Sequence, residues 1–289
     1  MKFLKVKKSG VRLDIFLTQE LGITRNQAQK RVESGSILVD GKTEKSNKKL
    51  EQGSLLTILE EIGKVTKKDA TLIIKRIYQD DNLIVIDKDP GTVVYPSYGH
   101  ESGTIIDALK ADINFSKNNR SGIVHRLDKD TSGLMIIARN EKTEDALKRE
   151  IKERQVLKKY LVLVWGRIEP AEGFIDIPLK RSEKDRKKIT ASSSGRLSKT
   201  QYKLIKYYKD YSLLEARILT GRTHQIRVHF SSIGFPVVGD KTYGKKSCYL
   251  LPRQFLHASY IRFNLFGKTY SFESELPLDL KNFLNISHL

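Results

Sequence analysis

The chain has 289 residues and a formal net charge of +19, and this excess of lysine and arginine favours a polyanionic partner. A generically basic surface is the alternative. The sequence has no apolar run long enough to span a bilayer and no signal-peptide core at its N-terminus, so we expect a cytoplasmic protein. A single cysteine, Cys248, excludes an internal disulfide framework and a cysteine-rich metal site.

Residues 12–62 are predicted to form a small unit of their own. Apolar residues at helical spacing predict two short helices, and the second begins after Thr24, a good N-cap, and ends near Gly35. The turn Asp40-Gly41 and the apolar segments around it predict a small sheet. The polar side of the second helix carries Arg25, Lys30 and Arg31.

Residues 63–71 are rich in lysine and poor in apolar groups, which predicts a linker to a second domain over 72–289. In that domain strands and helices mix without a βαβ repeat, and several strands follow one another directly. This pattern predicts an α+β fold with a mixed, largely antiparallel sheet flanked by helices and loops. The predicted strands are 83–87, 134–138, 160–164, 201–206 and 212–219, and the predicted helices are 104–110 and 143–153.

The stretch 180–188 is densely charged, and 191–198 is small and polar. We expect an exposed loop here rather than a regular element, since such sequences bury little apolar surface. Contact with phosphates is the alternative role.

Residues 125–133, His-Arg-Leu-Asp-Lys-Asp-Thr-Ser-Gly, are the most informative segment. Asp128 lies beside the cation Arg126, on a predicted tight turn that leads into an apolar strand. Such a turn fixes the carboxylate and leaves it accessible, which suits a nucleophile or a base. The alternative is that Asp128 caps the turn through backbone amides.

The segment 219–234 predicts a strand, a glycine turn and a short helix capped by Thr223. Arg227 neighbours the apolar face of this helix, where an arginine needs a partner, and Asp128 is the natural one. A buried arginine beside a carboxylate favours the ionised form that a nucleophile requires. His224 and His229 are an alternative metal pair, but a spacing of five does not place them on one helical face, so no metal is expected.

The spelling HRLD-x-x-TSG resembles the signature of the RluA family of pseudouridine synthases, which isomerise uridine in RNA. Three further segments are similar to motifs of that family: 82–97, 158–166 and 219–229. Residues 12–60 are similar to the alpha-L RNA-binding module, which is also found in a small-subunit ribosomal protein and in tyrosyl-tRNA synthetases. Gln52-Gly53-Ser54 stands where that module usually has Gly-Asp, which makes its last strand less secure.

The resemblance implies a reaction in which Asp128 acts at the sugar, either by attacking C1′ or by removing the 2′ proton. The position of Tyr160 in the sequence alone indicates a core residue of a buried strand. The resemblance implies that Tyr160 stacks on the flipped uracil and offers its hydroxyl. Arg126 would fill the gap left by that base, with a phosphate contact as its alternative role. Arg227 completes the catalytic set, and RNA binding is assigned to His125, Arg222, Arg25, Lys30 and Arg31. Arg222 could either contact a phosphate or hold the loop of Asp128.

The implied partner is RNA, first of all large-subunit ribosomal RNA, either free or within a preribosomal particle. Transfer RNA is the alternative substrate. No cofactor is expected, because the isomerisation changes neither composition nor redox state, and we expect a monomer. Two other classes remain: a non-catalytic RNA-binding ribosome-assembly protein, and a glycoside or nucleoside hydrolase. The hydrolase usually needs a second carboxylate opposite the first, and Asp130 is too close along the turn to provide it.

Overall fold

The protein is described by a computed structural model that forms two compact units, Met1–Ala70 and Thr71–Leu289. The described residues are 2–33, 35–58, 72–96, 102–114, 122–244, 248 and 251–286. The expected linker at 63–71 therefore lies outside the described residues. Across the described ranges, none of the helices has the length and apolar character needed to cross a membrane.

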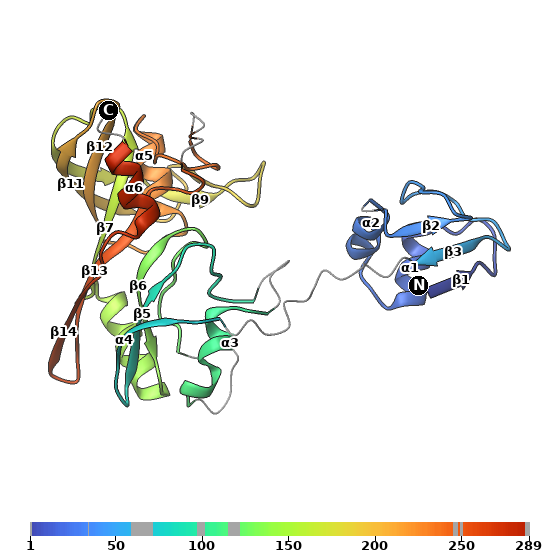
Figure 1. The fold of residues 1–289 in the computed structure, drawn as a ribbon, viewed down its shortest axis with the longest axis horizontal. Helices are drawn as coiled ribbons and strands as arrows, with labels where there is room; N and C mark the ends of the chain where they lie inside the picture. The colour runs from blue at the N-terminus through green and yellow to red at the C-terminus, as the bar shows by residue number, and fades with distance from the viewer. Residues whose placement is uncertain are drawn as a thin grey trace. The chain divides into compact units, whose positions relative to one another are not determined.

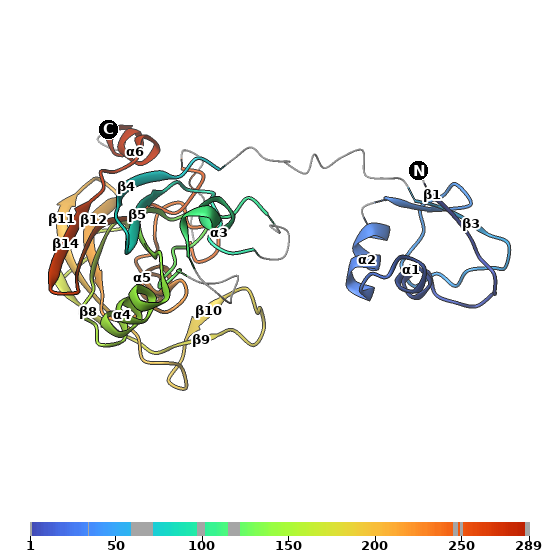
Figure 2. The same cartoon turned by 90° about the horizontal axis from the view of Figure 1, so that it is seen from below.

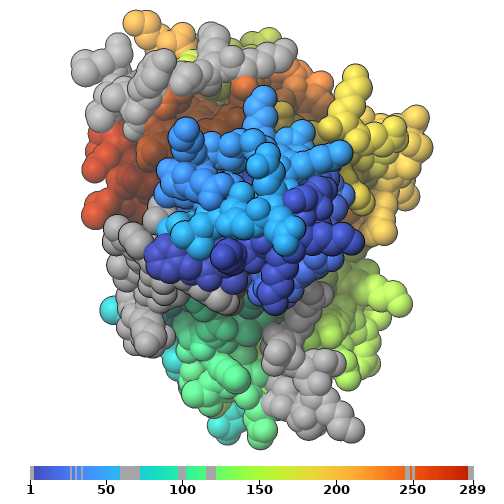
Figure 3. All heavy atoms as spheres, turned by 90° about the vertical axis from the view of Figure 1, so that its right-hand side faces the viewer, coloured from blue at the N-terminus to red at the C-terminus, as the bar shows by residue number. Residues whose placement is uncertain are grey.

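The N-terminal unit packs two helices against a three-stranded sheet, and it is drawn in blue in Figure 3. Its apolar core uses the residues that the helical spacing predicts, such as Leu13, Leu17 and Ala28. The strand order is β1-β3-β2, so the sheet also includes a strand ahead of residue 12. The elements are β1 (Lys2–Lys5), α1 (Leu13–Leu21), α2 (Arg25–Glu33), β2 (Ile37–Val39) and β3 (Leu55–Ile58).

The second unit is built on one large sheet, in which nine strands are described (Figure 1). The strand order is β4-β5-β6-β13-β7-β12-β11-β8, and β14 pairs with β13. The strands are β4 (Lys75–Gln79), β5 (Leu83–Lys88), β6 (Ser132–Ala138), β7 (Leu157–Trp165), β8 (Glu172–Asp176), β11 (Lys199–Tyr207), β12 (Tyr211–Ile218), β13 (Leu256–Leu265) and β14 (Lys268–Glu273).

The middle of this sheet is filled by the late strand β13, which lies between β6 and β7. It pairs in parallel with β6, while the other pairs in the sheet are antiparallel. The predicted α+β fold with a mixed, largely antiparallel sheet is therefore confirmed. Since β6 is buried along its whole length, both faces of the sheet must be covered at its centre.

Four helices provide this cover. On one face, α3 (Ile105–Leu109) and α5 (Gln225–Ser232) pack into a core with Met135, Ile137 and Val162. On the opposite face, α4 (Glu141–Lys152) packs behind β6, and α6 (Leu278–Ile286) packs behind β7. Because side chains alternate along a strand, neighbouring residues point to opposite faces of the sheet and pack under different helices.

The segment that we expected to be a loop contains a second, two-stranded sheet. Strands β9 (Leu179–Arg181) and β10 (Ile189–Ala191) pair antiparallel, and Figure 2 shows this hairpin reaching out from the large sheet. Residues 182–188 between the strands form no helix or strand and are mostly exposed, as expected, so the expectation is wrong only where the two strands overlap it. Local packing holds β9 in place. Leu179 is buried, and Gly195 approaches its backbone so closely that an added Cβ would lie 2.6 Å from the Leu179 carbonyl carbon.

Candidate active site

Asp128 lies on a tight turn directly before β6, as predicted. The N–H of Thr131 donates to the carbonyl of Asp128 at 3.1 Å, which closes the turn. Gly133 follows with φ +113°, and a Cβ there would lie 2.3 Å from the carbonyl oxygen of Ala258 in β13. Only glycine permits this approach, so the turn is held against the centre of the sheet.

Two long basic side chains hold the same turn through its carbonyl oxygens. Lys88 Nζ donates to the carbonyl of Lys129 at 2.8 Å, and Arg253 Nη1 donates to the carbonyl of Asp130 at 3.1 Å. Arg253 is itself paired through two nitrogens with Asp279 of α6. The backbone around Asp128 is thus fixed from two sides.

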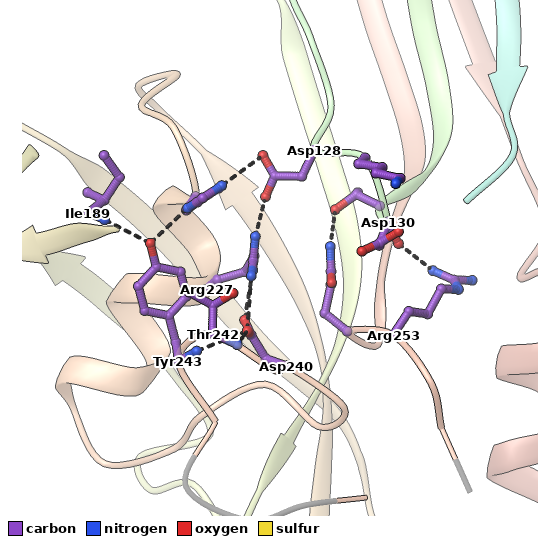
Figure 4. A network of polar contacts seen from close by, with 12 residues as sticks. Asp128, Asp130, Ile189, Arg227, Asp240, Thr242, Tyr243 and Arg253 are labelled. Carbon is purple, nitrogen blue, oxygen red and sulfur yellow. Dashed lines mark hydrogen bonds and ion pairs between the residues drawn. The ribbon is translucent and has the colours of Figure 1, made fainter. Parts of the chain in front are cut away.

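The predicted pairing of Arg227 with Asp128 is present. Arg227 Nη1 donates to Oδ2 of Asp128 at 2.9 Å, across 99 positions of sequence (Figure 4). The same guanidinium makes a bidentate pair with Asp240, at 2.7 Å from Nε and 3.0 Å from Nη2. Asp240 is fully buried and also accepts the backbone N–H groups of Thr242 and Tyr243.

Asp240 explains how an arginine can be buried here. Burial alone would lower the pKa of Arg227, but the hydrogen bonds and negative charges of Asp240 and Asp128 outweigh it and raise that pKa. Burial alone would likewise raise the pKa of Asp240, and its hydrogen bonds with Arg227 lower it instead. Arg227 therefore stays a cation with its guanidinium directed at Asp128.

Asp128 opens onto a cavity of about 230 Å³. One wall is Tyr160, which is buried in β7, and burial with the nearby charge of Asp128 raises the pKa of its phenol. Tyr160 therefore keeps its proton at neutral pH and offers a flat ring with a hydroxyl donor. The lining also includes His125, Arg126, Lys158, Arg222, His224 and Leu256.

Two basic side chains in the lining are affected by burial. It lowers the pKa of His125 to about 3, and Nε2 of this neutral ring accepts the N–H of Ile136 at 2.9 Å. His125 thus ties the start of the motif to β6, and its contact with RNA stays a prediction. Burial also lowers the pKa of Lys158 to about 8, so this side chain brings a cation to the cavity at neutral pH.

The predicted RNA-contacting arginines differ in their surroundings. Arg126 is exposed and lines both this cavity and a second one of about 270 Å³, which Asp128 also lines. Arg222 is exposed, and its Nε donates to the carbonyl of Leu197 at 3.2 Å. This contact ties Arg222 to the 191–198 segment. Its two expected roles, holding the loop of Asp128 and contacting a phosphate, both stay predictions.

The N-terminal candidates belong to the first unit and stay predictions. Arg25 is half-exposed and pairs through Nε with the buried Asp14 at 3.0 Å. Arg31 is exposed on α2. The side chain of Lys30 lies outside the described residues.

The two histidines of the alternative metal pair have other contacts. His229 meets the hydroxyl of Thr200 and the carbonyl of Ile177, and His224 meets the hydroxyl of Tyr243 at 2.7 Å. In the described ranges, no three His, Cys, Asp or Glu side chains gather as a metal site would require. The expectation of no metal stays a prediction.

The start of α5 differs from the prediction. The helix begins at Gln225 after His224, not after Thr223, and His224 adopts the left-handed conformation with φ 54°. His224 makes no side-chain capping bond to the helix, and the side chain of Gln225 instead binds the turn before it: its Oε1 accepts the N–H of Arg222 and the hydroxyl of Thr220. This network holds the glycine turn rigidly at the cavity.

Sequence reasoning missed Asp240, Tyr243, Gln225 and Lys158, and it weighed His224 only as a metal ligand. A signal for Asp240 was present, because this acid directly follows the apolar run Val237–Gly239. Its partner was not readable from the sequence, since the pairing depends on a chain reversal after α5.

Comparison with known proteins identifies both units. Residues 82–232 match the family described as RNA pseudouridylate synthase, and residues 11–56 match the S4 domain. A protein of Aquifex aeolicus named as an RNA pseudouridine synthase is 40% identical over 252 residues, covering 84% of this chain and 80% of that protein. The ribosomal large subunit pseudouridine synthase D of Buchnera aphidicola is 36% identical over 296 residues, covering 96% of this chain and 94% of its own.

A solved structure shows the same fold. The human protein RNA Pseudouridylate Synthase Domain Containing 1 superposes with a TM-score of 0.60 at 25% identity, covering 72% of this chain and 86% of the human chain. The chain therefore belongs to the RNA pseudouridylate synthase family and is an RNA pseudouridine synthase with an N-terminal S4 domain.

Proposed function

We propose that this enzyme isomerises uridines of large-subunit ribosomal RNA and that Asp128 is the residue that acts at the sugar. The observation that carries the proposal is the position of Asp128, whose carboxylate lines a cavity between Tyr160 and Arg227. A carboxylate with one oxygen fixed by a buried arginine is oriented and has a cation beside its charge. Both properties suit chemistry at C1′ or at the 2′ proton.

The substrate class rests on relatives and on charge. Three relatives named ribosomal large subunit pseudouridine synthase D are 35–37% identical to this chain. The net charge of +19 and the S4 domain suit a large structured RNA, because many phosphates can be neutralised at once. Arg25, Lys30 and Arg31 are the phosphate contacts that we propose on the S4 domain.

The reaction exchanges one bond for another. The bond from N1 of uracil to C1′ breaks, and a bond from C5 to C1′ forms. C5 loses a proton and N1 gains one, so the atoms balance without an oxidant or a reductant. Asp128 serves either as the nucleophile at C1′ or as the base that takes the 2′ proton, and both routes require an ionised carboxylate beside the ribose.

The cavity suits a base that has left the helical stack. Tyr160 stacks against the uracil and its phenol donates a hydrogen bond, while Lys158 supplies a cation for a uracil carbonyl. Arg126 is exposed beside Asp128, so its planar guanidinium fills the gap that the flipped base leaves. His125 and Arg222 hold the two loops that frame the cavity.

The test compares Asp128→Asn with the wild type on ribosomal RNA from cells that lack the enzyme. We expect the rate of pseudouridine formation to fall at least about a thousandfold, while RNA affinity changes less than about twofold. Asp130→Asn is the matched control, since Asp130 is an exposed acid of the same turn, and it should keep near wild-type activity.

Turnover by Asp128→Asn within tenfold of wild type would exclude Asp128 as the acting residue. Incubation with transfer RNA forms the second arm. Modification of transfer RNA in place of large-subunit RNA would show that the substrate class is wrong while leaving the role of Asp128 intact.

A further inference from the structure

His224 has an unusual backbone for its place. It has φ 54° and ψ 20°, in the left-handed region, directly before α5. A residue other than glycine occupies that region at an energetic cost, and such strain gathers at functional sites. The conformation directs the imidazole toward Asp128, with Nε2 3.8 Å from Oδ1.

Tyr243 fixes the other side of the imidazole. Its hydroxyl oxygen lies 2.7 Å from Nδ1 of His224, and the two rings meet edge to face. The same oxygen accepts the N–H of Ile189, in β10, at 2.9 Å (Figure 4). With that lone pair engaged, the hydroxyl hydrogen of Tyr243 is free to donate to Nδ1.

This arrangement sets the tautomer of His224. Burial lowers the pKa of His224, so the ring is neutral and carries one proton. When Nδ1 accepts from Tyr243, that proton is on Nε2, the atom that faces the carboxylate. The opposite tautomer would turn a lone pair toward a negative charge, which is repulsive.

The two oxygens of Asp128 are then distinguished. Oδ2 accepts from Arg227 at 2.9 Å, whereas Oδ1 has the N–H of His224 at 3.8 Å, beyond hydrogen-bond length but within close electrostatic range. Arg126, Arg227 and Asp240 also act on His224 through their charges.

We propose that His224 is a positioning residue for Asp128, with its tautomer set by Tyr243. The inference rests on the proposed function, since it requires Asp128 to be the acting residue. The N–H of His224 attracts Oδ1 electrostatically, without a hydrogen bond, and so favours one direction of Oδ1 toward the ribose, while Tyr243 keeps the Nε2 proton in place. Tyr243 accepts a hydrogen bond from Ile189 of β10. The basic β9–β10 hairpin therefore supports Tyr243 and, through His224, the orientation of Asp128.

The first variants separate positioning from folding. His224→Gly removes the ring and its contact with Tyr243 but relieves the left-handed backbone, so the two effects oppose each other and thermal stability should stay close to wild type. We expect kcat to fall about ten- to a hundredfold with KM within about twofold, the size seen when an orienting partner is lost. His224→Gln places an N–H donor near the position of Nε2 and should recover part of that rate.

Tyr243→Phe tests the chain of contacts. It should lower kcat about tenfold in the wild-type background and have little further effect in His224→Gly, because both residues act through one route. All variants are assayed as full-length protein on the same ribosomal RNA, beside Asp128→Asn.

The outcomes distinguish the two proposals. An inactive Asp128→Asn with His224→Gly and Tyr243→Phe both within twofold of wild type overturns the role of His224 and leaves that of Asp128. An active Asp128→Asn overturns the proposed function itself. If a rise in KM accounted for the whole loss of kcat/KM, His224 would be an RNA contact instead. If the effects of the two variants on kcat were additive, His224 would be a structural residue that does not act through Tyr243.

Discussion

The two units of the chain each contain an aspartate held by arginine, and they use it differently. Asp14 in the S4 domain is fully buried and accepts hydrogen bonds from Arg12, Arg25 and Gln29, at 2.9–3.0 Å. Asp128 keeps 19% of its side chain exposed and accepts one such bond, from Arg227, within the described residues.

The difference separates a carboxylate that is fully engaged within the fold from one that keeps an oxygen available, as the role proposed for Asp128 requires. The hydrogen bond from Arg12, followed by those from Gln29 and Arg25, holds the pKa of Asp14 well below its usual range despite burial. Its oxygens are all engaged, so it can only stabilise the fold. At Asp128 the arginine engages one oxygen and leaves the other facing the cavity residues.

The largest effect is expected from Arg227→Met, which removes the partner of two acids. The buried Asp240 is left without its cation, and this costs about 3–5 kcal/mol of unfolding free energy. Activity falls as well, because Asp128 loses its orienting donor. Urea unfolding followed through Trp165, the single tryptophan, measures the stability.

A double variant separates these two losses. Arg227→Met with Asp240→Asn removes the uncompensated charge, so much of the stability should return while activity does not. If activity returned together with stability, Arg227 would act only in folding.

Asp14→Asn is the corresponding change in the S4 domain. It weakens the hydrogen bonds from Arg12 and Arg25 and should cost about 2 kcal/mol of local stability, with the catalytic domain unaffected. Backbone amide exchange at Leu17 and Ala28, both buried in the core of this unit, reports the loss. An equal shift in the unfolding of the region around Trp165 would mean that the units are not independent.

The pH dependence of the same unit follows from the lowered pKa of Asp14. A carboxylate whose pKa is depressed by folding stabilises the protein above its unfolded pKa, about 3.9, and that contribution is lost as pH falls toward the folded pKa. Amide protection of α1 should therefore decline below about pH 4 in the wild type. Asp14→Asn should show a flatter profile, and an identical profile would contradict the assignment.

Removal of residues 1–62 should have the smallest effect on chemistry. We expect a folded, active catalytic domain whose RNA affinity is about tenfold lower, with a shallower slope of log affinity against log salt, because phosphate contacts are lost. Filter binding at several salt concentrations measures both. An unchanged slope would exclude the S4 domain as a source of phosphate contacts.

Local sequence signals predicted what is local in the structure. The turn at Asp128, the strand after it and the helix that carries Arg227 follow from glycine placement and apolar spacing. The pairing of Arg227 with Asp128 was also predictable, since a buried arginine needs an acid. Asp240 and Tyr243 were not, because their contacts with Arg227 and His224 depend on the chain reversal after α5. The β9–β10 hairpin was not either, because it depends on backbone packing around Leu179.

The position of β13 has a consequence for the folding of the nascent chain during synthesis. This strand, Leu256–Leu265, is synthesised after Asp128, Tyr160 and Arg227, yet it lies between β6 and β7 and contacts Gly133 beside the turn of Asp128. A nascent chain that stops before residue 256 has no strand to join the two halves of its sheet. Catalysis should therefore begin only when synthesis has passed β13, so that unfinished chains bind RNA through the S4 domain without modifying it.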